Sequence, residues 1–516
     1  MDRRSKPDGT FAGSSNHVGF GRRQMLGAAT AALGGAALAA PIAAAAPETH
    51  VRKWDHDFDV IVIGFGVSGG AAAYEALKAG ARTLVLDRGS AAHSESHGVN
   101  VYMGGGTPLQ KAYKVEDTPE NMLKYLLASQ GPQPEKEKIS IFVDRSLGHF
   151  QWLLDIGMRF SEDPQDKCLS YSGNENAWPC NGWAVPAMRG HRPPGRGGTG
   201  AWIQKTLLEA TRQGATQLLA ADAERLVQGS DGAIQGVLAS VDGKTQSFRA
   251  RRGVILATGG FANNRDMVAR YAPEYLACAP LDVGSNDGWG IRAGQAVRAG
   301  ISRISGVNCF AAFQPPVERI QGILVNRLGQ RFLPEDSYYG VIAEAIVMRQ
   351  GGVAHLVVDA EAFGDPSKRP HVAGMPERDE IAARADTVAE LEQKLGIPAP
   401  DLQQTIETYN RYAANGHDPL FFKNAVYLRP LTKPPFTAIK GSVGDAYFTY
   451  FTVGGLQTTP DTEVLDIDGA PIPGLYAVGR TATGVLGPHF YHSGISLGEG
   501  TIFGRIAGEH AASRRA

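Results

Sequence analysis

The sequence predicts an α/β fold in which a Rossmann-like, dinucleotide-binding domain is interrupted by an inserted α+β domain. Three observations predict it. Residues 57–89 have the pattern strand, glycine turn, helix and strand; residues 253–261 form a later apolar strand that ends in Ala-Thr-Gly-Gly-Phe; and residues 301–440 mix strands and helices without a nucleotide-binding signature. Glycine-rich, strand-like segments return after residue 440. At 516 residues the chain is long enough for two domains.

The charge balance and the cysteines exclude several classes of function. Lysine and arginine total 51 and aspartate and glutamate total 52, so the net charge does not favour nucleic acid as a partner. The four cysteines, Cys168, Cys180, Cys278 and Cys309, lack metal-ligand spacing. We therefore expect isolated thiols, with neither a disulfide framework nor a metal site.

The first 46 residues do not have the pattern of a folded domain. Arg22 and Arg23 precede a weakly apolar run of alanine and glycine, and residues 44–46 offer a small-residue cleavage site. This pattern resembles a Tat export signal. A transmembrane anchor is the alternative, but the glycine and alanine content and Pro41 disfavour a stable span. We expect removal on export of a chain that has loaded its cofactor in the cytoplasm, and a mature protein in the periplasm, at the cell surface or outside the cell.

The glycine turn at the start of the folded region is a candidate nucleotide site. Gly64 permits a tight turn, Gly66 lets the backbone approach a pyrophosphate, and Gly69 lets the following helix pack on the strand. The helix N-terminus offers unpaired N–H groups to phosphate. An acid about 20 residues later suits a ribose hydroxyl. The motif does not distinguish NAD from FAD. The candidate contacts are Gly64, Gly66, Ser68, Gly69, Asp87 and Arg88.

Later glycine-containing segments are candidates for further backbone contacts with the same cofactor. A triple glycine can lie against a flat ring, although an ordinary glycine loop is the alternative. The returning strand and the turn at residues 285–290 also end in glycines. The candidates are Gly104, Gly105, Gly106, Thr107, Ala257, Thr258, Gly259, Asp287 and Gly288.

The last candidates precede the C-terminal helix, in residues 489–500. Ser496 and Leu497 are expected to contact the cofactor through the start of this helix. Glu499, with glycines on both sides, suits hydroxyl groups of the cofactor. A carboxylate that satisfies backbone N–H groups is the alternative for Glu499.

Taken together, these motifs resemble the fumarate reductase/succinate dehydrogenase flavoprotein superfamily. The segments G-x-G-x-x-G, A-T-G-G-F, T-x-G-G-L, G-L-Y-A-x-G and Y-x-S-G-x-S-L-G occur in the family's order between about residues 57 and 512. The resemblance implies an FAD domain made of residues 55–300 and 440–512, with a capping domain at 301–439. It also implies FAD whose N5 accepts or donates a hydride. His93 and His97 are conceivable attachment points, but such histidines are more often surface groups, so we expect non-covalent FAD.

Two positions separate this chain from the fumarate-type reductases that it resembles. Phe451 stands where those enzymes carry the histidine of H-T-x-G-G, and Tyr339 stands where they carry an arginine after R-F-x-x-E. A buried dicarboxylate needs such charged partners. The residues Tyr339, Tyr491 and Ser493 instead resemble the 3-ketosteroid dehydrogenases, particularly the Δ4-(5α) type. The Δ1 type has Y-P-G-A-G-G where this chain has Y-H-S-G, so that resemblance is weaker.

This resemblance implies desaturation beside a ring ketone of a steroid or a related hydrophobic ketone. The Tyr491 hydroxyl and the Gly494 N–H are candidates to polarise the ketone oxygen. Ser493 and Tyr339 are candidates to accept the proton, through a hydroxyl relay because an ordinary tyrosine is a poor base. Packing residues are the alternative for both tyrosines.

Two other functions remain open. One is a reductase of an activated alkene that receives electrons from an external donor, since the sequence has no haem motif and no iron–sulfur spacing. The other is a non-catalytic electron-transfer module, against which the inserted domain and the hydroxyl-bearing residues argue.

Overall fold

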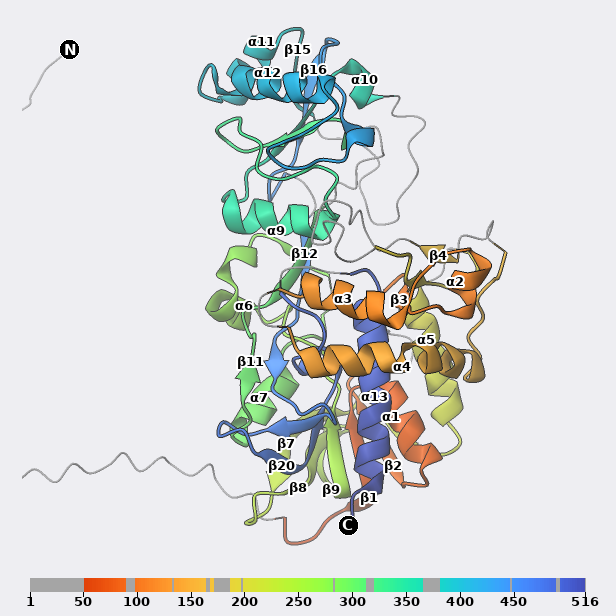
Figure 1. Ribbon diagram of the computed structural model, residues 1–516. Helices are drawn as coiled ribbons and strands as arrows, with labels where there is room; N and C mark the ends of the chain where they lie inside the picture. Colours follow the sequence, from red (N-terminus) through yellow and green to blue (C-terminus); the bar gives the residue numbers. More distant parts are fainter. Residues whose placement is uncertain are drawn as a thin grey trace, which may run out of the picture. The chain divides into compact units, whose positions relative to one another are not determined.

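The computed structural model describes residues 51–89, 98–131, 134–163, 168–170, 186–195, 198–281, 284–311, 320–364, 381–445, 448–488 and 492–515 (Figure 1). The chain divides into residues 1–47 and 48–516, and all described residues belong to the second unit. The expected export segment lies outside the described residues.

The largest sheet has the order β19-β20-β9-β1-β2-β6, with β8 and then β7 added beside β9. The pairs β1–β2, β1–β9, β2–β6 and β9–β20 are parallel. Its strands are β1 (His56–Ile63), β2 (Thr83–Asp87), β6 (Thr216–Leu219), β7 (Asp222–Gln228), β8 (Ile234–Val241), β9 (Lys244–Leu256), β19 (Glu463–Leu465) and β20 (Pro471–Ala477).

The second half of β1, residues 60–63, is buried on both faces, which explains its continuous apolar sequence. Ile61 and Ile63 belong to one core cluster, and Val60 and Val62 belong to the cluster on the opposite face. The predicted α/β fold with a parallel nucleotide-binding sheet is confirmed.

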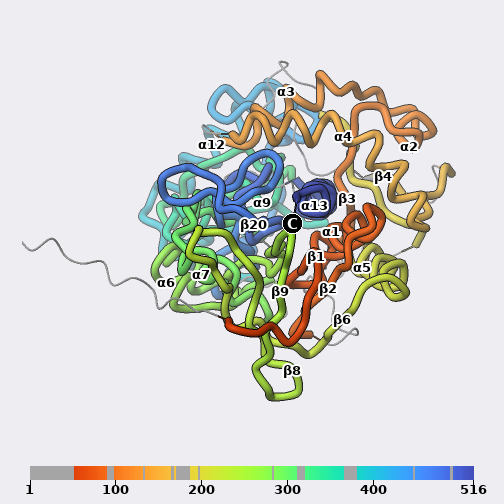
Figure 2. The backbone as a smooth tube through the Cα atoms, turned by 90° about the horizontal axis from the view of Figure 1, so that it is seen from below, coloured from red at the N-terminus to blue at the C-terminus, as the bar shows by residue number. Residues whose placement is uncertain are grey.

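The C-terminal helix α13 (Ile495–Ser513) packs against α1 (Val67–Lys78) at backbone distance, and Figures 1 and 2 show the two side by side. Gly500, Gly504 and Gly508 form a stripe at a spacing of four residues on α13. A Cβ at Gly504 would overlap the Ser68 carbonyl oxygen, and one at Gly508 would overlap that of Ala72. Only glycine at these positions permits so close an approach.

The other helices of this part pack around the large sheet and the helix pair. They are α2 (Pro108–Ala112), α3 (Pro119–Ser129), α4 (Lys136–Asp155), α5 (Thr199–Thr211), α6 (Arg265–Tyr271), α7 (Trp289–Ala296) and the 3₁₀ turns η2 (Pro273–Tyr275) and η5 (Gly479–Thr481). Small sheets are β3-β5-β4, from β3 (Val101–Tyr102), β4 (Leu169–Ser170) and β5 (Gly190–His191), and β11-β18, from β11 (Ile301–Ser302) and β18 (Gly455–Leu456).

The inserted part contains an antiparallel sheet of order β13-β14-β16-β15. Figure 1 shows α10, α11 and α12 gathered around β15 and β16. Its elements are β13 (Ile323–Val325), α9 (Tyr339–Arg349), β14 (His355–Val358), α10 (Ala360–Phe363), β15 (Ile381–Ala385), α11 (Val388–Leu395), α12 (Asp401–Ala414), the 3₁₀ turn η4 (Ala425–Tyr427) and β16 (Phe436–Lys440).

A three-stranded sheet joins the two parts. The chain leaves the nucleotide-binding part through β12 (Val307–Ala311) and returns through β17 (Phe448–Thr452), and these strands pair antiparallel, with β10 (Ala279–Pro280) on the other edge of β17. Strands β11 and β12 lie inside the predicted range 301–439 yet pair with strands outside it. The predicted boundary therefore falls within a paired ribbon.

Two of the cysteines are not isolated. Cys309, on β12, and Cys278, just before β10, share a side-chain hydrogen bond. Both are buried free thiols, as expected, but they lie side by side in the region of the joining sheet.

The described residues contain neither a membrane-spanning helix nor a metal-binding cluster. None of their helices is both long enough and apolar enough to cross a bilayer. They also hold no group of three or more His, Cys, Asp or Glu side chains arranged to bind a metal ion.

His191, on β5, is buried as a neutral ring. Its Nδ1 donates to the Arg189 carbonyl oxygen at 2.9 Å, so Nε2 accepts from the Thr107 hydroxyl at 2.8 Å. Burial lowers the pKa of His191 to about 4.

We expect the fold to lose stability in acid because of His191. An unfolded histidine titrates near pH 6.5, so the unfolded chain takes up this proton first as the pH falls. The stability contributed by neutral His191 is lost between about pH 6.5 and 4, on the order of 3 kcal/mol. His191→Gln should flatten this part of the pH dependence of the thermal unfolding midpoint. His417→Gln, at an exposed position, is the control. Equal pH dependence in wild type and His191→Gln would contradict the prediction.

Candidate active site

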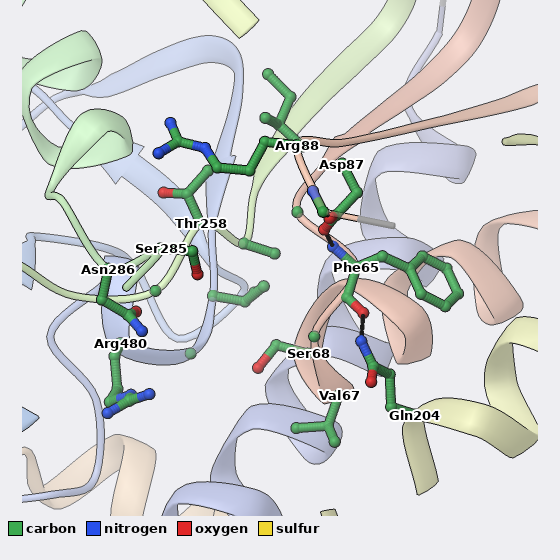
Figure 3. A pocket seen from close by; sticks show the side chains of 18 of the residues that line it. Phe65, Val67, Ser68, Asp87, Arg88, Gln204, Thr258, Ser285, Asn286 and Arg480 are labelled. Carbon is green, nitrogen blue, oxygen red and sulfur yellow. Dashed lines mark hydrogen bonds between the residues drawn. The ribbon is translucent and has the colours of Figure 1, made fainter. Parts of the chain in front are cut away.

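A cavity opens where β1, β2 and β9 end, at the carboxyl edge of the parallel sheet (Figure 3). Most of the predicted cofactor contacts line it. These are Gly64, Gly66, Ser68, Asp87, Arg88, Ala257, Thr258, Gly259, Asp287, Ser496 and Leu497.

Two long helices begin at this cavity with glycine as the N-cap. Gly66 caps α1, Gly494 caps α13, and both glycines line the cavity. A glycine has no side chain to cap its helix, so the partial positive charge of each helix end is directed to the cavity. A pyrophosphate and an electron-rich ring fit such a site.

Asp87 closes the glycine turn. Its Oδ2 accepts from the Phe65 N–H at 2.5 Å and its Oδ1 accepts from the Gly89 N–H at 2.7 Å, and burial raises its pKa. A carboxylate has lone pairs beyond these two bonds, so the predicted contact with a ribose hydroxyl is compatible with this arrangement. Arg88 forms an ion pair with Asp287 at 3.2 Å.

Two predicted glycines act through packing and do not line the cavity. A Cβ at Gly69 would overlap the Gly64 carbonyl oxygen, so Gly69 lets α1 approach the turn. Gly288 has a φ of +75°, and a Cβ there would lie 2.5 Å from the Met267 Sδ. It begins α7 and holds it close to α6.

The N–H groups of the triple-glycine loop have partners within the protein. The Gly104 N–H donates to Ser146, the Gly105 N–H donates to Asp117, and the N–H groups of Gly106 and Thr107 donate to the Gln110 Oε1, all at 2.9 Å. None of these four predicted residues lines the cavity. Their donors anchor the loop to α2, to α4 and to the segment before α3.

Glu499 lies in a smaller cavity that shares Gly479, Arg480 and Ser496 with the first. Its carboxylate accepts from the Leu486 N–H at 3.2 Å, and burial raises its pKa to about 7. These contacts correspond to the alternative role of Glu499, a carboxylate that satisfies backbone N–H groups.

Of the predicted catalytic residues, Gly494 lines the cavity, with a φ of +92°. Ser493 precedes it, and its Oγ accepts from the Asn100 amide at 3.1 Å. Tyr339 begins α9, and neither it nor Ser493 lines this cavity itself. Tyr491 lies outside the described residues.

An aromatic series connects Tyr339 with the cavity. The Tyr339 ring lies 5.5 Å from that of Phe310, which lies 5.7 Å from that of Phe451, a lining residue. The Arg480 guanidinium covers the Phe451 ring at 5.0 Å.

A buried charge cluster fixes the start of α9. Glu335 pairs with Arg331 at 2.7 Å and with Lys423 at 3.1 Å. Burial alone would raise the pKa of Glu335, but these two cations hold it at about 2. The segment that leads to Tyr339 is therefore rigidly anchored.

The sequence did not indicate several lining residues. Arg480 directly follows the glycine of G-L-Y-A-V-G, and its position after a strand could have drawn attention to it. Asn286 accepts from the Gly260 N–H at 2.9 Å, which a sequence pattern does not show. In Figure 3, Asn286 and Arg480 lie across the cavity from Phe65 and Asp87.

Comparison with known proteins identifies the family. The profile of the FAD binding domain family matches residues 59–497. The chain belongs to this family. It is a member of the fumarate reductase/succinate dehydrogenase flavoprotein superfamily, an FAD-dependent oxidoreductase that acts on CH–CH bonds. The prediction of FAD is confirmed.

Individual members of the superfamily are similar over most of the chain. The structure of the 3-ketosteroid-Δ4-(5α)-dehydrogenase of Rhodococcus jostii RHA1, in complex with 4-androstene-3,17-dione, has a TM-score of 0.84 at 38% identity, covering 90% of this chain and 99% of that one. The 3-oxo-5-alpha-steroid 4-dehydrogenase of Comamonas testosteroni is 26% identical, covering 83% and 93%. The probable fumarate reductase Ifc3 of Shewanella frigidimarina is 28% identical, covering 88% and 74%.

We expect Gly66→Leu to fold without FAD, because a side chain at the N-cap of α1 would occupy the space through which a pyrophosphate approaches the start of this helix. The flavin absorbance of the purified variant measures this. Gly148→Leu, at an exposed helical site with no atom near the new Cβ, should keep the full flavin spectrum. A yellow, fully loaded Gly66→Leu variant would count against the assigned site.

Proposed function

We propose that this chain is an FAD-dependent 3-ketosteroid dehydrogenase that introduces a ring double bond beside the 3-oxo group, at the Δ4 position of a 5α-steroid. The observation that carries the proposal is the aromatic series from Phe451 through Phe310 to Tyr339. It presents apolar area with a hydroxyl at its end, which suits a steroid bearing one ketone. The similarity to the Rhodococcus enzyme supports the same substrate class.

The proposed roles follow from the needs of the reaction. Bound FAD supplies a hydride acceptor. The Gly494 N–H, with the expected Tyr491 hydroxyl, polarises the ketone oxygen, which makes the adjacent C–H acidic. Ser493 accepts that proton, and Tyr339 belongs to the hydroxyl relay that carries it away. Arg480 and Gly494, at the N-terminus of α13, both line the cavity, and their positive charge favours the negative charge that develops during hydride transfer.

A second candidate function is reduction of an activated alkene with electrons from an external donor. Arg480 favours it, because this cation lines the cavity and could pair with one carboxylate. A dicarboxylate needs a second partner, and Phe451 occupies the position at which the sequence resemblance places the histidine of fumarate-type reductases. The steroid reaction therefore remains the better match.

We also propose that the protein is exported from the cytoplasm. Arg22 and Arg23 before a weakly apolar run support Tat export of the folded, FAD-loaded enzyme. We expect lysine at both positions to retain the protein in the cytoplasm, measured by immunoblot of cell fractions. Unchanged export of the double variant would refute this location, and wild-type chain alongside it controls for lysis.

The catalytic roles predict the rates of single-turnover flavin reduction by a 3-keto-5α-steroid. Tyr491→Phe should cost about 10²–10³-fold, the usual effect of one oxyanion donor, with FAD still bound. Ser493→Ala should slow the reaction by removing the proton acceptor. Tyr412→Phe, on α12, is the control for loss of a tyrosine hydroxyl.

Two outcomes would contradict the assignment. Wild-type rates in both Tyr491→Phe and Ser493→Ala would leave the desaturation without its proposed groups. Oxidation of dye-reduced enzyme by fumarate at a rate comparable to steroid turnover would favour the reductase.

A further inference from the structure

The Asn100 side-chain amide donates a hydrogen bond to the Ser493 hydroxyl, which belongs to a distant part of the sequence. Asn100 immediately precedes β3, is buried, and lies 393 positions before Ser493 in the chain. Two further contacts tie the same segments together: the Tyr102 N–H donates to the Gly494 carbonyl oxygen at 3.0 Å, and a Cβ at Gly494 would lie 2.6 Å from the Asn100 carbonyl oxygen. These backbone contacts fix the main chain of Asn100 relative to that of Gly494, so the Asn100 amide starts from a fixed position beside Ser493.

The chemistry of this bond sets the orientation of the serine hydroxyl. The Asn100 amide nitrogen, which contacts the Ser493 Oγ at 3.1 Å, can only donate. It occupies one of the two lone pairs of Oγ and turns the O–H bond away from Asn100. One lone pair and one O–H then remain, which are the two features that a proton relay needs.

We propose that Asn100 is a positioning residue that prepares Ser493 for proton transfer, an inference that rests on the proposed steroid dehydrogenation. The Ser493 proton leaves along its O–H bond to the next hydroxyl or water, so that Oγ becomes more negative and takes up the C–H proton beside the ketone. The electron pair of that C–H bond moves toward the ketone oxygen. The hydride from the neighbouring carbon goes to FAD, so the substrate loses two protons and two electrons in total.

Asn100 also acts on the charge that Oγ carries while the two protons are exchanged. A hydrogen bond donated to an oxygen stabilises its more negative form. Removing it should slow the proton step and move the pH profile of flavin reduction to higher pH, because Oγ then loses its proton less readily. A neutral hydrogen bond accounts for about a 10-fold change in rate.

The test compares Asn100→Leu with wild type in anaerobic single-turnover flavin reduction by a 3-keto-5α-steroid. Leucine keeps the branched shape and removes the donor, and Asn100→Ala serves if leucine is not accommodated. We expect about a 10-fold slower reaction, an alkaline shift of the pH profile, and unchanged FAD content. Deuterium at the carbon beside the ketone should slow the variant more than wild type, whereas deuterium at the hydride-donating carbon should not.

Two controls distinguish positioning from a general loss of structure. In the Ser493→Ala background, Asn100→Leu should have no further effect on the rate, because the group it positions is absent. Gln217→Leu removes an amide-to-hydroxyl bond of the same kind, 2.8 Å from the Gln217 Nε2 to the Thr211 Oγ1, at residues that do not line the cavity. It should leave the rate, pH profile and isotope effects unchanged.

The outcomes separate this inference from the proposed function. A slow Ser493→Ala variant beside an Asn100→Leu variant with wild-type rate, pH profile and isotope effects would overturn the role of Asn100 alone. Absence of flavin reduction by any 3-keto-steroid in the wild type would overturn the proposed function and this inference with it. A rate loss in Asn100→Leu that persists fully in the Ser493→Ala background would show a structural effect and also overturn the inference.

Discussion

The backbone-close packing of α13 on α1 is the constraint on which the site depends. Gly500, Gly504 and Gly508 remove the side chains that would keep the two helices apart, and Ser68 and Ala72 occupy that space. Because the helices approach so closely, the ends capped by Gly66 and Gly494 meet at one cavity. Residues more than 400 positions apart thus create one region of positive potential, which neither helix could produce alone.

The aromatic residues that extend from Tyr339 toward the cavity depend on a different kind of interaction. Buried charges around Glu335 hold the segment that begins α9, and aromatic contacts then extend from Tyr339 to the cavity. The charges belong to the inserted part, whereas the backbone donors belong to the nucleotide-binding part. Two parts of the chain, held by different kinds of interaction, thus contribute to the surroundings of one cavity.

The elements of the nucleotide-binding part could be predicted because local sequence determines them. The run before Gly64 is apolar on both faces, and β9, which ends at Leu256, is followed by its own glycine signal at Gly259. The triple glycine could not be interpreted in this way, since its N–H groups are taken by Asp117 and Gln110, whose approach depends on tertiary packing. The bond between Asn100 and Ser493 joins distant segments and leaves no local pattern. The spacing of four between Gly500, Gly504 and Gly508 is visible in the sequence, but the sequence alone does not show that these glycines pack against α1.

The paired strands β12 and β17 carry both crossings between the two parts of the chain. Phe310 is on one and Phe451 is on the other, so the aromatic wall is built on the ribbon that connects the parts. The connection between the two parts and the aromatic contacts beside the cavity therefore share the same two strands, so a substitution in this ribbon acts on both at once.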